Sequence, residues 1–463
     1  MPPDQPDTLA ADAAGPALVD PGHPCPEPPV GRPVPAAVAI AVVAAALGLV
    51  VLWGQALDRA GVGIFLKAPP FVGEWRLLWS PALWWAVALG ALLVGWWSPA
   101  TERLRWGWVL AGSGLWALIW PALLQWSEGW DSLYTVLGNR RAYLPTAQAI
   151  DSPAEFLRTF VERVPDYPTH VKGHPPGATL AHWFVDLVGG GRSDVLTATF
   201  LVIAASAAPA SLVALDRIAG RCAARRAAPF VGLAPAAMWI ASSPDAMFMG
   251  VVAWSVALGA VAITVEPSDA RRRIGLHLAA GGAGLFAGLS LSFSYGSMLL
   301  LGPLWALAVW TLRRGNWRPL VTAAVGFAII PLLFMSAGFD WFAGLEATRT
   351  AYLDGVAPGR PDRYFIVSNL VVTAVSVGPA TIVALVWLRD RAASWLVGGA
   401  LAGILAANAS TMSKGEVERI WLPAVPFLVL ATCSIRGTNA RRWWLAAQLG
   451  VAVVLQATLD APW

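Results

Sequence analysis

The chain has 463 residues, of which 57% are hydrophobic and only 13% are charged, and its mean hydropathy is +0.59. Soluble domains carry about 25% charged residues, so this composition excludes a soluble globular protein. The net charge of +4 does not indicate nucleic-acid binding, because the basic residues fall in short segments between apolar runs, where they orient a membrane protein. We therefore expect an all-α polytopic membrane protein that binds no nucleic acid.

Residues 1–35 are rich in Pro, Ala and Asp and have no apolar periodicity. They predict a disordered cytoplasmic tail, without the basic start and small-residue cleavage site of a signal peptide. The three cysteines, Cys25, Cys222 and Cys433, are far apart and form no CxxC motif. We expect isolated thiols, with neither a disulfide framework nor a zinc site.

Apolar runs follow the tail at lengths close to the roughly 20 residues that cross a bilayer. They predict about 13 transmembrane helices, at 36–54, 82–98, 106–125, 195–215, 229–243, 246–265, 275–293, 297–312, 320–338, 366–388, 394–411, 419–435 and 443–458. The shorter stretch 178–190 predicts an interfacial helix. We expect an N-terminal hairpin over 36–98, a membrane core over 99–435, and a C-terminal loop and last span over 436–463.

The arginines indicate the orientation of these spans. With the N-terminus inside, the cytoplasmic loops are 99–105, 216–228, 266–274, 313–319, 389–393 and 436–442. These six loops hold 17 basic and five acidic residues, whereas the opposite side is longer and holds 14 basic and 18 acidic residues. This asymmetry follows the positive-inside rule. It predicts a plasma-membrane protein with a cytoplasmic N-terminus, an extracytoplasmic C-terminus and outer loops at 55–81, 126–194, 339–365 and 412–418.

Two candidate catalytic acids, Glu128 and Asp131, follow the third span. They are three residues apart and would share one face if the helix continued. A carboxylate at the membrane surface can act as general base for a sugar hydroxyl. The alternative is a solvated helix end beside interfacial tryptophans.

Basic and aromatic residues follow at Arg140, Arg141 and Tyr143, before an amphipathic stretch from Asp151 to Val164 that predicts a surface helix. Arginine pairs bind phosphate bidentately. The same pair could instead extend to lipid phosphates without specificity.

A second polar segment contains His170, Lys172 and His174 and ends in two prolines. The prolines exclude helical geometry at His174, so we expect an extended segment with these three side chains on one side. Such a strip suits a phosphate leaving group. Two histidines could also ligate a metal, but no third ligand is evident, so a divalent metal is not supported and no cofactor is expected.

The remaining candidate substrate-binding residues are Asp245, Tyr352, Arg363, Glu416 and Arg419. Asp245 could hold a substrate hydroxyl or cap the next helix, and the local sequence favours the cap. Arg419 begins an apolar run, where a charge is costly unless paired, and Glu416 is its expected partner. Salt-bridged anchoring is the alternative to a contact with a lipid phosphate.

Three of these features resemble the GT-C glycosyltransferases of actinobacterial cell envelopes. They are the acids that open a long outer loop, the Pro-Asp-Ala turn at 244–246, and the Glu-Arg-Ile-Trp-Leu-Pro segment at 418–423. The His-Val-Lys-Gly-His-Pro-Pro-Gly segment at 170–177 is similar to a narrower group that includes the mycobacterial methylthioxylosyl transferase. The hairpin that precedes the catalytic loop departs from the family pattern. Either the hairpin is an addition, or the loop 55–81 with Asp58 and Glu74 is the true first loop. We favour the addition, because 55–81 is too short to hold two surface helices.

The resemblance implies an inverting transfer of a sugar from a polyprenyl-phosphate donor to a cell-envelope glycan or glycolipid on the extracytoplasmic face. Asp131 or Glu128 would be the base, and Arg141, Lys172, His174 and Arg419 would surround the departing phosphate. The alternative is a transporter or lipid-sugar flippase without catalysis. That class would carry charges in mid-span and an inverted repeat.

Overall fold

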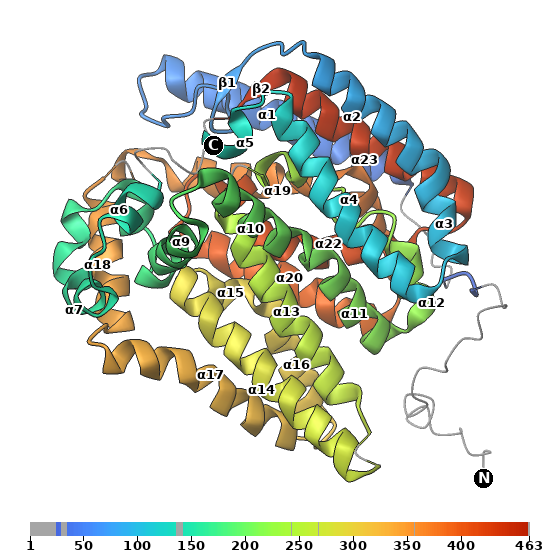
Figure 1. Cartoon of the computed structure of the whole chain (residues 1–463). Coiled ribbons are helices and arrows are strands. Elements are labelled where there is room, and N and C mark those ends of the chain that lie inside the picture. Colours follow the sequence, from blue (N-terminus) through green and yellow to red (C-terminus); the bar gives the residue numbers. More distant parts are fainter. Residues whose placement is uncertain are drawn as a thin grey trace, which may run out of the picture.

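Long helices dominate the protein (Figure 1). The computed structural model describes residues 25–28, 35–135, 142–241, 243–266, 268–355 and 357–461. Within these ranges nine helical segments are long and apolar enough to cross a membrane. They are α1 (Ala36–Arg59), the run of α2 (Pro81–Leu92), η2 (Leu93–Trp97) and α3 (Ser98–Arg103), α4 (Trp106–Trp126), the pair α10 (Ser193–Ala205) and α11 (Ala207–Ala219), α13 (Asp245–Thr264), α14 (Ala270–Phe293), α17 (Arg318–Ser336), α19 (Asp362–Trp387) and α20 (Arg391–Ala409). These nine long apolar segments bear out the expected all-α membrane architecture for the described residues.

The other described elements are shorter or less apolar. They are α5 (Ser132–Thr135), α6 (Leu144–Gln148), α7 (Pro153–Arg163), η4 (Val164–Asp166), α8 (Thr169–Lys172), α9 (Pro176–Gly189), α12 (Arg221–Ala227), η5 (Pro235–Trp239), α15 (Ser297–Leu300), α16 (Gly302–Arg313), α18 (Trp341–Leu353), η6 (Ala357–Gly359), α21 (Val417–Ile420), η7 (Leu422–Ala424), α22 (Val425–Val429), η8 (Leu430–Ser434) and α23 (Thr438–Thr458), with strands β1 (Glu74–Trp75) and β2 (Leu459–Asp460). Side chains of Ser152, Asp269, Asp340 and Asp390 accept backbone N–H groups where α7, α14, α18 and α20 begin, as N-caps do.

The expected number of 13 spans is not confirmed, and two of the expected spans, 229–243 and 419–435, contain no long α-helix. The run 229–243 contains Pro229, Gly232 and Pro235 and folds as turns and the 3-10 helix η5. The run 419–435 contains two further prolines and divides into α21, η7, α22 and η8. Proline removes a backbone hydrogen-bond donor and clashes with the preceding helical turn, so these runs cannot form continuous α-helices. Their apolar composition correctly indicates that they are buried, but it does not indicate their secondary structure.

Both irregular runs nevertheless connect the same two ends of the molecule. At one end the Arg226 side chain donates to the Cys433 carbonyl over 2.7 Å. At the other end Arg419 pairs with Asp245, with 2.6 Å between Nη1 and Oδ2. Irregular backbone at membrane depth is tolerated where protein buries it, and nearly all residues of both runs are buried.

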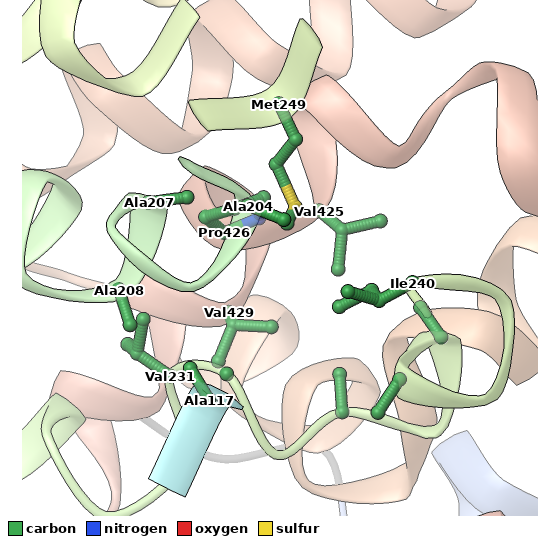
Figure 2. A pocket seen from close by; sticks show the side chains of 14 residues that line it. Ala117, Ala204, Ala207, Ala208, Val231, Ile240, Met249, Val425, Pro426 and Val429 are labelled. Carbon is green, nitrogen blue, oxygen red and sulfur yellow. The ribbon is translucent and has the colours of Figure 1, made fainter. Parts of the chain in front are cut away.

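A small cavity of about 20 Å³ lies where the two irregular runs meet α4, α10 and α13 (Figure 2). Its lining side chains, which include Ala117, Ala204, Val231, Met249 and Val425, are all apolar. A cavity without polar partners does not hold an ordered water. The cavity is therefore a packing defect between irregular segments and not a ligand site.

Loops that the arginine pattern assigns to one side do meet at one end. Arg225 donates to the Thr101 carbonyl over 2.6 Å, and Arg441 forms an ion pair with Glu102. Loops 99–105, 216–228 and 436–442 are thus neighbours. In Figure 1, α3 and α12 lie at the right, whereas α6, α7 and α18 lie at the left. The orientation of the two ends relative to the cytoplasm stays a prediction.

Two cysteines form a disulfide, so the prediction of isolated thiols is wrong for them. Cys25 and Cys222 are bonded across 197 residues of sequence, whereas Cys433 is free and buried. Sequence spacing could not reveal the pair, because residues 25–28 fold back onto the Arg-rich end. There the Pro26 carbonyl accepts a hydrogen bond from Arg226, and the Glu27 carboxylate accepts one from the backbone N–H of Gly437.

The first and last parts of the chain pack together. α1 packs against α19, and α2 packs against α4 and α23. β1 pairs antiparallel with β2, with Glu74 opposite Asp460 and Trp75 opposite Leu459. The segments expected to form an N-terminal hairpin therefore contact C-terminal elements.

The span α19 contains a break that a side chain of α23 fills. Gly378 has a φ of 82°, and Pro379 follows it. Gln448 accepts from the Ala380 N–H over 3.1 Å and donates to the Val377 carbonyl over 2.6 Å. The backbone groups released by the break therefore keep partners, as an apolar setting requires.

Glycines allow α14 and α17 to approach closely. A Cβ atom at Gly284 would overlap the Ala323 carbonyl, whereas one at Gly275, in the same helix, would meet open space. We expect Gly284→Ala to destabilise the protein by about 1–3 kcal/mol through overpacking. Gly275→Ala should stabilise the protein by about 0.4–1 kcal/mol, because alanine lowers the conformational entropy of the unfolded chain. Thermal unfolding of the purified variants measures both, and equal effects would contradict the close packing.

The disulfide predicts a specific peptide pair. Protease digestion of unreduced protein should release a peptide containing Cys25 linked to one containing Cys222, and mass spectrometry should resolve it into two peptides after reduction. Cys433 should stay unmodified by a thiol reagent until the protein unfolds, because its side chain is buried. Recovery of Cys25 and Cys222 as free thiols from unreduced protein would contradict the pairing.

Candidate functional site

An arginine lies between two carboxylates at the end opposite the disulfide. Arg419 Nη1 lies 2.6 Å from Asp245 Oδ2, and the Arg419 guanidinium also pairs with Glu416. Arg419 is 5% exposed and Asp245 3% exposed. The expected partnership with Glu416 is confirmed, and the cap role favoured for Asp245 is wrong, because its side chain does not cap α13.

Local backbone geometry positions these three side chains. Glu416 has a positive φ of 62° and follows Gly415, whose φ is 89°. This tight turn starts α21 one residue later, so that Glu416 and Arg419 are separated by one helical turn. Asp245 is the first residue of α13, and Ser243 Oγ donates to its Oδ2 over 2.8 Å.

His174 adjoins the same carboxylate. Its Nε2 lies 3.9 Å from Asp245 Oδ1, and its Nδ1 lies 2.9 Å from the His170 carbonyl. The expected extended strip is wrong, because residues 169–172 form the single-turn helix α8 and the prolines act only after His174. Burial lowers the pKa of His174 below its usual value, although Asp245 opposes this shift. A neutral His174 that donates Nδ1–H to the carbonyl keeps Nε2 as an acceptor.

Aromatic rings cover the histidine. The Tyr143 ring centroid lies 5.7 Å from that of His174, 6.0 Å from that of His170 and 4.7 Å from that of His182. His182 is fully buried, and burial lowers its pKa to about 4. Tyr143, His170 and His174 are therefore neighbours, and His182 is a further neighbour that the sequence did not single out.

The charge balance of the cluster does not favour a phosphate. The positive charge of Arg419 is already paired with Asp245 and Glu416. Arg360, which lies near Glu416, donates to the Lys414 carbonyl. Lys172 turns away, because its Nζ donates to the Pro165 carbonyl over 3.1 Å. Carboxylates and a neutral imidazole accept hydrogen bonds from hydroxyl groups, so this arrangement suits a polyol better than an anion.

The two later outer loops are joined beside the cluster. Lys414 Nζ lies 2.8 Å from Asp362 Oδ1, and the Tyr352 hydroxyl lies 3.4 Å from the Thr411 carbonyl. Burial raises the pKa of Tyr352 to about 12. Arg363 is exposed in the first turn of α19. The loops 339–365 and 412–418 therefore contact each other next to the cluster.

The two expected catalytic acids have different surroundings. α4 ends at Trp126, and Gly129, with a φ of 122°, turns the chain, so Glu128 and Asp131 do not continue one helix face. Glu128 pairs with Arg76 and accepts from Gln456 Nε2 over 2.7 Å. Burial raises its pKa, and Arg76 opposes that shift. Asp131 is exposed just before α5, and Arg140 and Arg141 lie outside the described residues.

A third carboxyl near the cluster was not among the expected site residues. Glu418 is 2% exposed, and burial raises its pKa to about 7. The Val72 N–H donates to it, which joins the first outer loop to α21. The signal was present in the sequence, since Glu418 lies beside Arg419, but only the fold shows which of the neighbouring acids is buried.

No protein-family model matches the chain, and neither a curated protein nor a solved structure matches it. Among the described residues, no group of three or more His, Cys, Asp or Glu side chains could hold a metal ion. The site is therefore interpreted from its own geometry.

The raised pKa of Glu418 predicts a pH dependence of stability. The unfolded carboxyl loses its proton near pH 4.5, whereas the folded one keeps it to about pH 7. The folded state binds more protons between these values, so this group's contribution to stability falls as the pH rises through that window. We expect Glu418→Gln to flatten the decline in Tm between pH 5 and 8. Glu162→Gln, at an exposed position of α7, should leave it unchanged; an equal slope in all three proteins would exclude a buried proton on Glu418.

Proposed function

We propose that the chain is a membrane glycosyltransferase that moves a sugar from a polyprenyl-phosphate donor to a cell-envelope glycan or glycolipid on the extracytoplasmic face. The observation that carries the proposal is the buried cluster of Asp245, Arg419, Glu416 and neutral His174 at one end of the membrane helices. Buried ionic groups in membrane proteins are costly and mark functional sites by default. Acceptors held in fixed positions suit the hydroxyl groups of a sugar.

The proposed reaction is a single displacement. The acceptor oxygen forms a bond to the anomeric carbon, the bond from that carbon to the phosphate oxygen breaks, and the phosphate leaves with the electron pair. Asp131 takes the acceptor proton. Its exposure at the surface, where an acceptor can reach it, supports this role. Two carboxylates neutralise Arg419, so we do not assign the binding of the departing phosphate to Arg419.

Two substitutions test the proposal on purified protein with a panel of radiolabelled decaprenyl-phosphate sugars. Asp131→Asn should lower transfer by about 10²–10⁴-fold, as loss of a general base does, without changing Tm. Asp245→Asn should lower both transfer and Tm, because it breaks the buried ion pair with Arg419 and leaves Glu416 as the remaining carboxylate partner. Asp194→Asn, at an exposed acid paired with Arg192, is the matched control and should retain transfer.

Normal transfer by Asp131→Asn would exclude Asp131 as the base. The other contrary outcome is that the unmodified protein transfers sugar from none of the donors and instead moves labelled lipid-linked sugar across the membrane of vesicles. This result would contradict the proposed enzyme and support the flippase alternative.

A further inference from the structure

An open groove of about 490 Å³ runs between α16 and α20. Tryptophans line it on both sides, Trp305 from α16 and Trp395 from α20. Its floor is made of glycine and alanine, including Gly398 and Ala402. The groove lies on the outer surface of the helix bundle, since Trp305, Gly398 and Ala402 are exposed.

Small residues create this shape. Gly302 of α16 and Gly399 of α20 are in such close contact that a Cβ on either would overlap the other helix. A Cβ at Gly398, one residue further round α20, would meet open space. The helices therefore touch along one line and diverge on the side that carries Gly398. Lipid fills such a space in a bilayer, because a void would lose dispersion contacts.

The length of the groove fits one chain of a membrane lipid. On α20 its lining extends from Ser394 to Ala406, which corresponds to about 18 Å of helix. One leaflet of a bilayer contributes about half of a hydrocarbon core roughly 30 Å thick. α20 is one of the candidate spans, so the groove faces hydrocarbon over this length.

Arginines surround one end of the groove. The Arg313 guanidinium lies 5.3 Å from the centroid of the Trp395 ring. Arg391 precedes Trp395 by four residues and so lies on the same face of α20, and both arginines are exposed. The nearby carboxylate of Asp390 is engaged by the N–H groups of Ala392 and Ala393 at 2.9 and 3.0 Å. This end is positive and faces the headgroup region.

We propose that the groove binds one anionic phospholipid, with an acyl chain between Trp305 and Trp395 and its phosphate on Arg313 and Arg391. The apolar groove fits the chain, and the arginines add selectivity for a negative headgroup. This site is independent of the proposed sugar transfer.

Native mass spectrometry of the detergent-purified full chain tests the proposal. The protein is mixed with equal amounts of phosphatidylglycerol and phosphatidylcholine that have the same acyl chains. The unmodified protein should retain one phosphatidylglycerol in preference to phosphatidylcholine. Arg313→Gln and Arg391→Gln should each lower that preference about five-fold, the effect of one cation near an anionic membrane surface. Arg271→Gln, at an exposed arginine of α14, should not.

Gly398→Leu should fill the groove and remove the retained lipid whatever its headgroup. Gly450→Leu is the matched control, because Gly450 is also an exposed helical glycine with open space around it. The proposal is overturned if the unmodified protein retains both lipids equally, or if Gly398→Leu leaves the retained lipid in place. It is also overturned if the groove is occupied by a second copy of the chain, seen as a dimer that Gly398→Leu dissociates.

Discussion

Arg419 is buried between the carboxylates of Asp245 and Glu416, and its ion pair with Asp245 joins α21 to the first residue of α13. Each of the two irregular buried runs has one end here, since 229–243 leads into Asp245 and 419–435 starts at Arg419. A charge without its partner would be far more costly in this position than the paired ions. The ion pair between Arg419 and Asp245 therefore holds together the ends of the runs 229–243 and 419–435, which are not continuous helices. His174 and the loops 339–365 and 412–418 lie beside this ion pair.

The sequence predicted the fold class, most helices and the grouping of loops because apolar length and arginine distribution are local properties. Glu416 and Arg419 were predicted as partners because one helical turn separates them. Asp245 joins them from 174 residues away, and the disulfide joins Cys25 to Cys222 across a similar separation. Local sequence does not encode such contacts. The expectation that His170, Lys172 and His174 form one extended strip assumes that Pro175 and Pro176 prevent helical structure in the residues before them. A proline in the first turn of a helix, however, is compatible with a preceding helical turn.

Every backbone polar group in an apolar setting needs a hydrogen-bond partner. The protein meets this requirement in two ways, by close packing of complete helices and by irregular segments that other parts of the protein bury. α14 and α17 use glycine to bring complete helices into contact. The runs 229–243 and 419–435 have prolines and depend on surrounding helices instead. The first solution leaves an outward groove beside α20, and the second leaves a small internal cavity (Figure 2). Of these two spaces, the groove is the larger and the more accessible to another molecule.

The break in α19 links the membrane core to the order in which the chain is made. At this break the Val377 carbonyl and the Ala380 N–H are bonded to the side chain of Gln448, which lies on α23. The same helix supplies Gln456 to Glu128 and leads directly into β2. A ribosome therefore releases α1, α4 and α19 well before the helix that completes their contacts. The contacts of Gln448 and Gln456 therefore form last, and the finished arrangement is reached only after translation has passed α23.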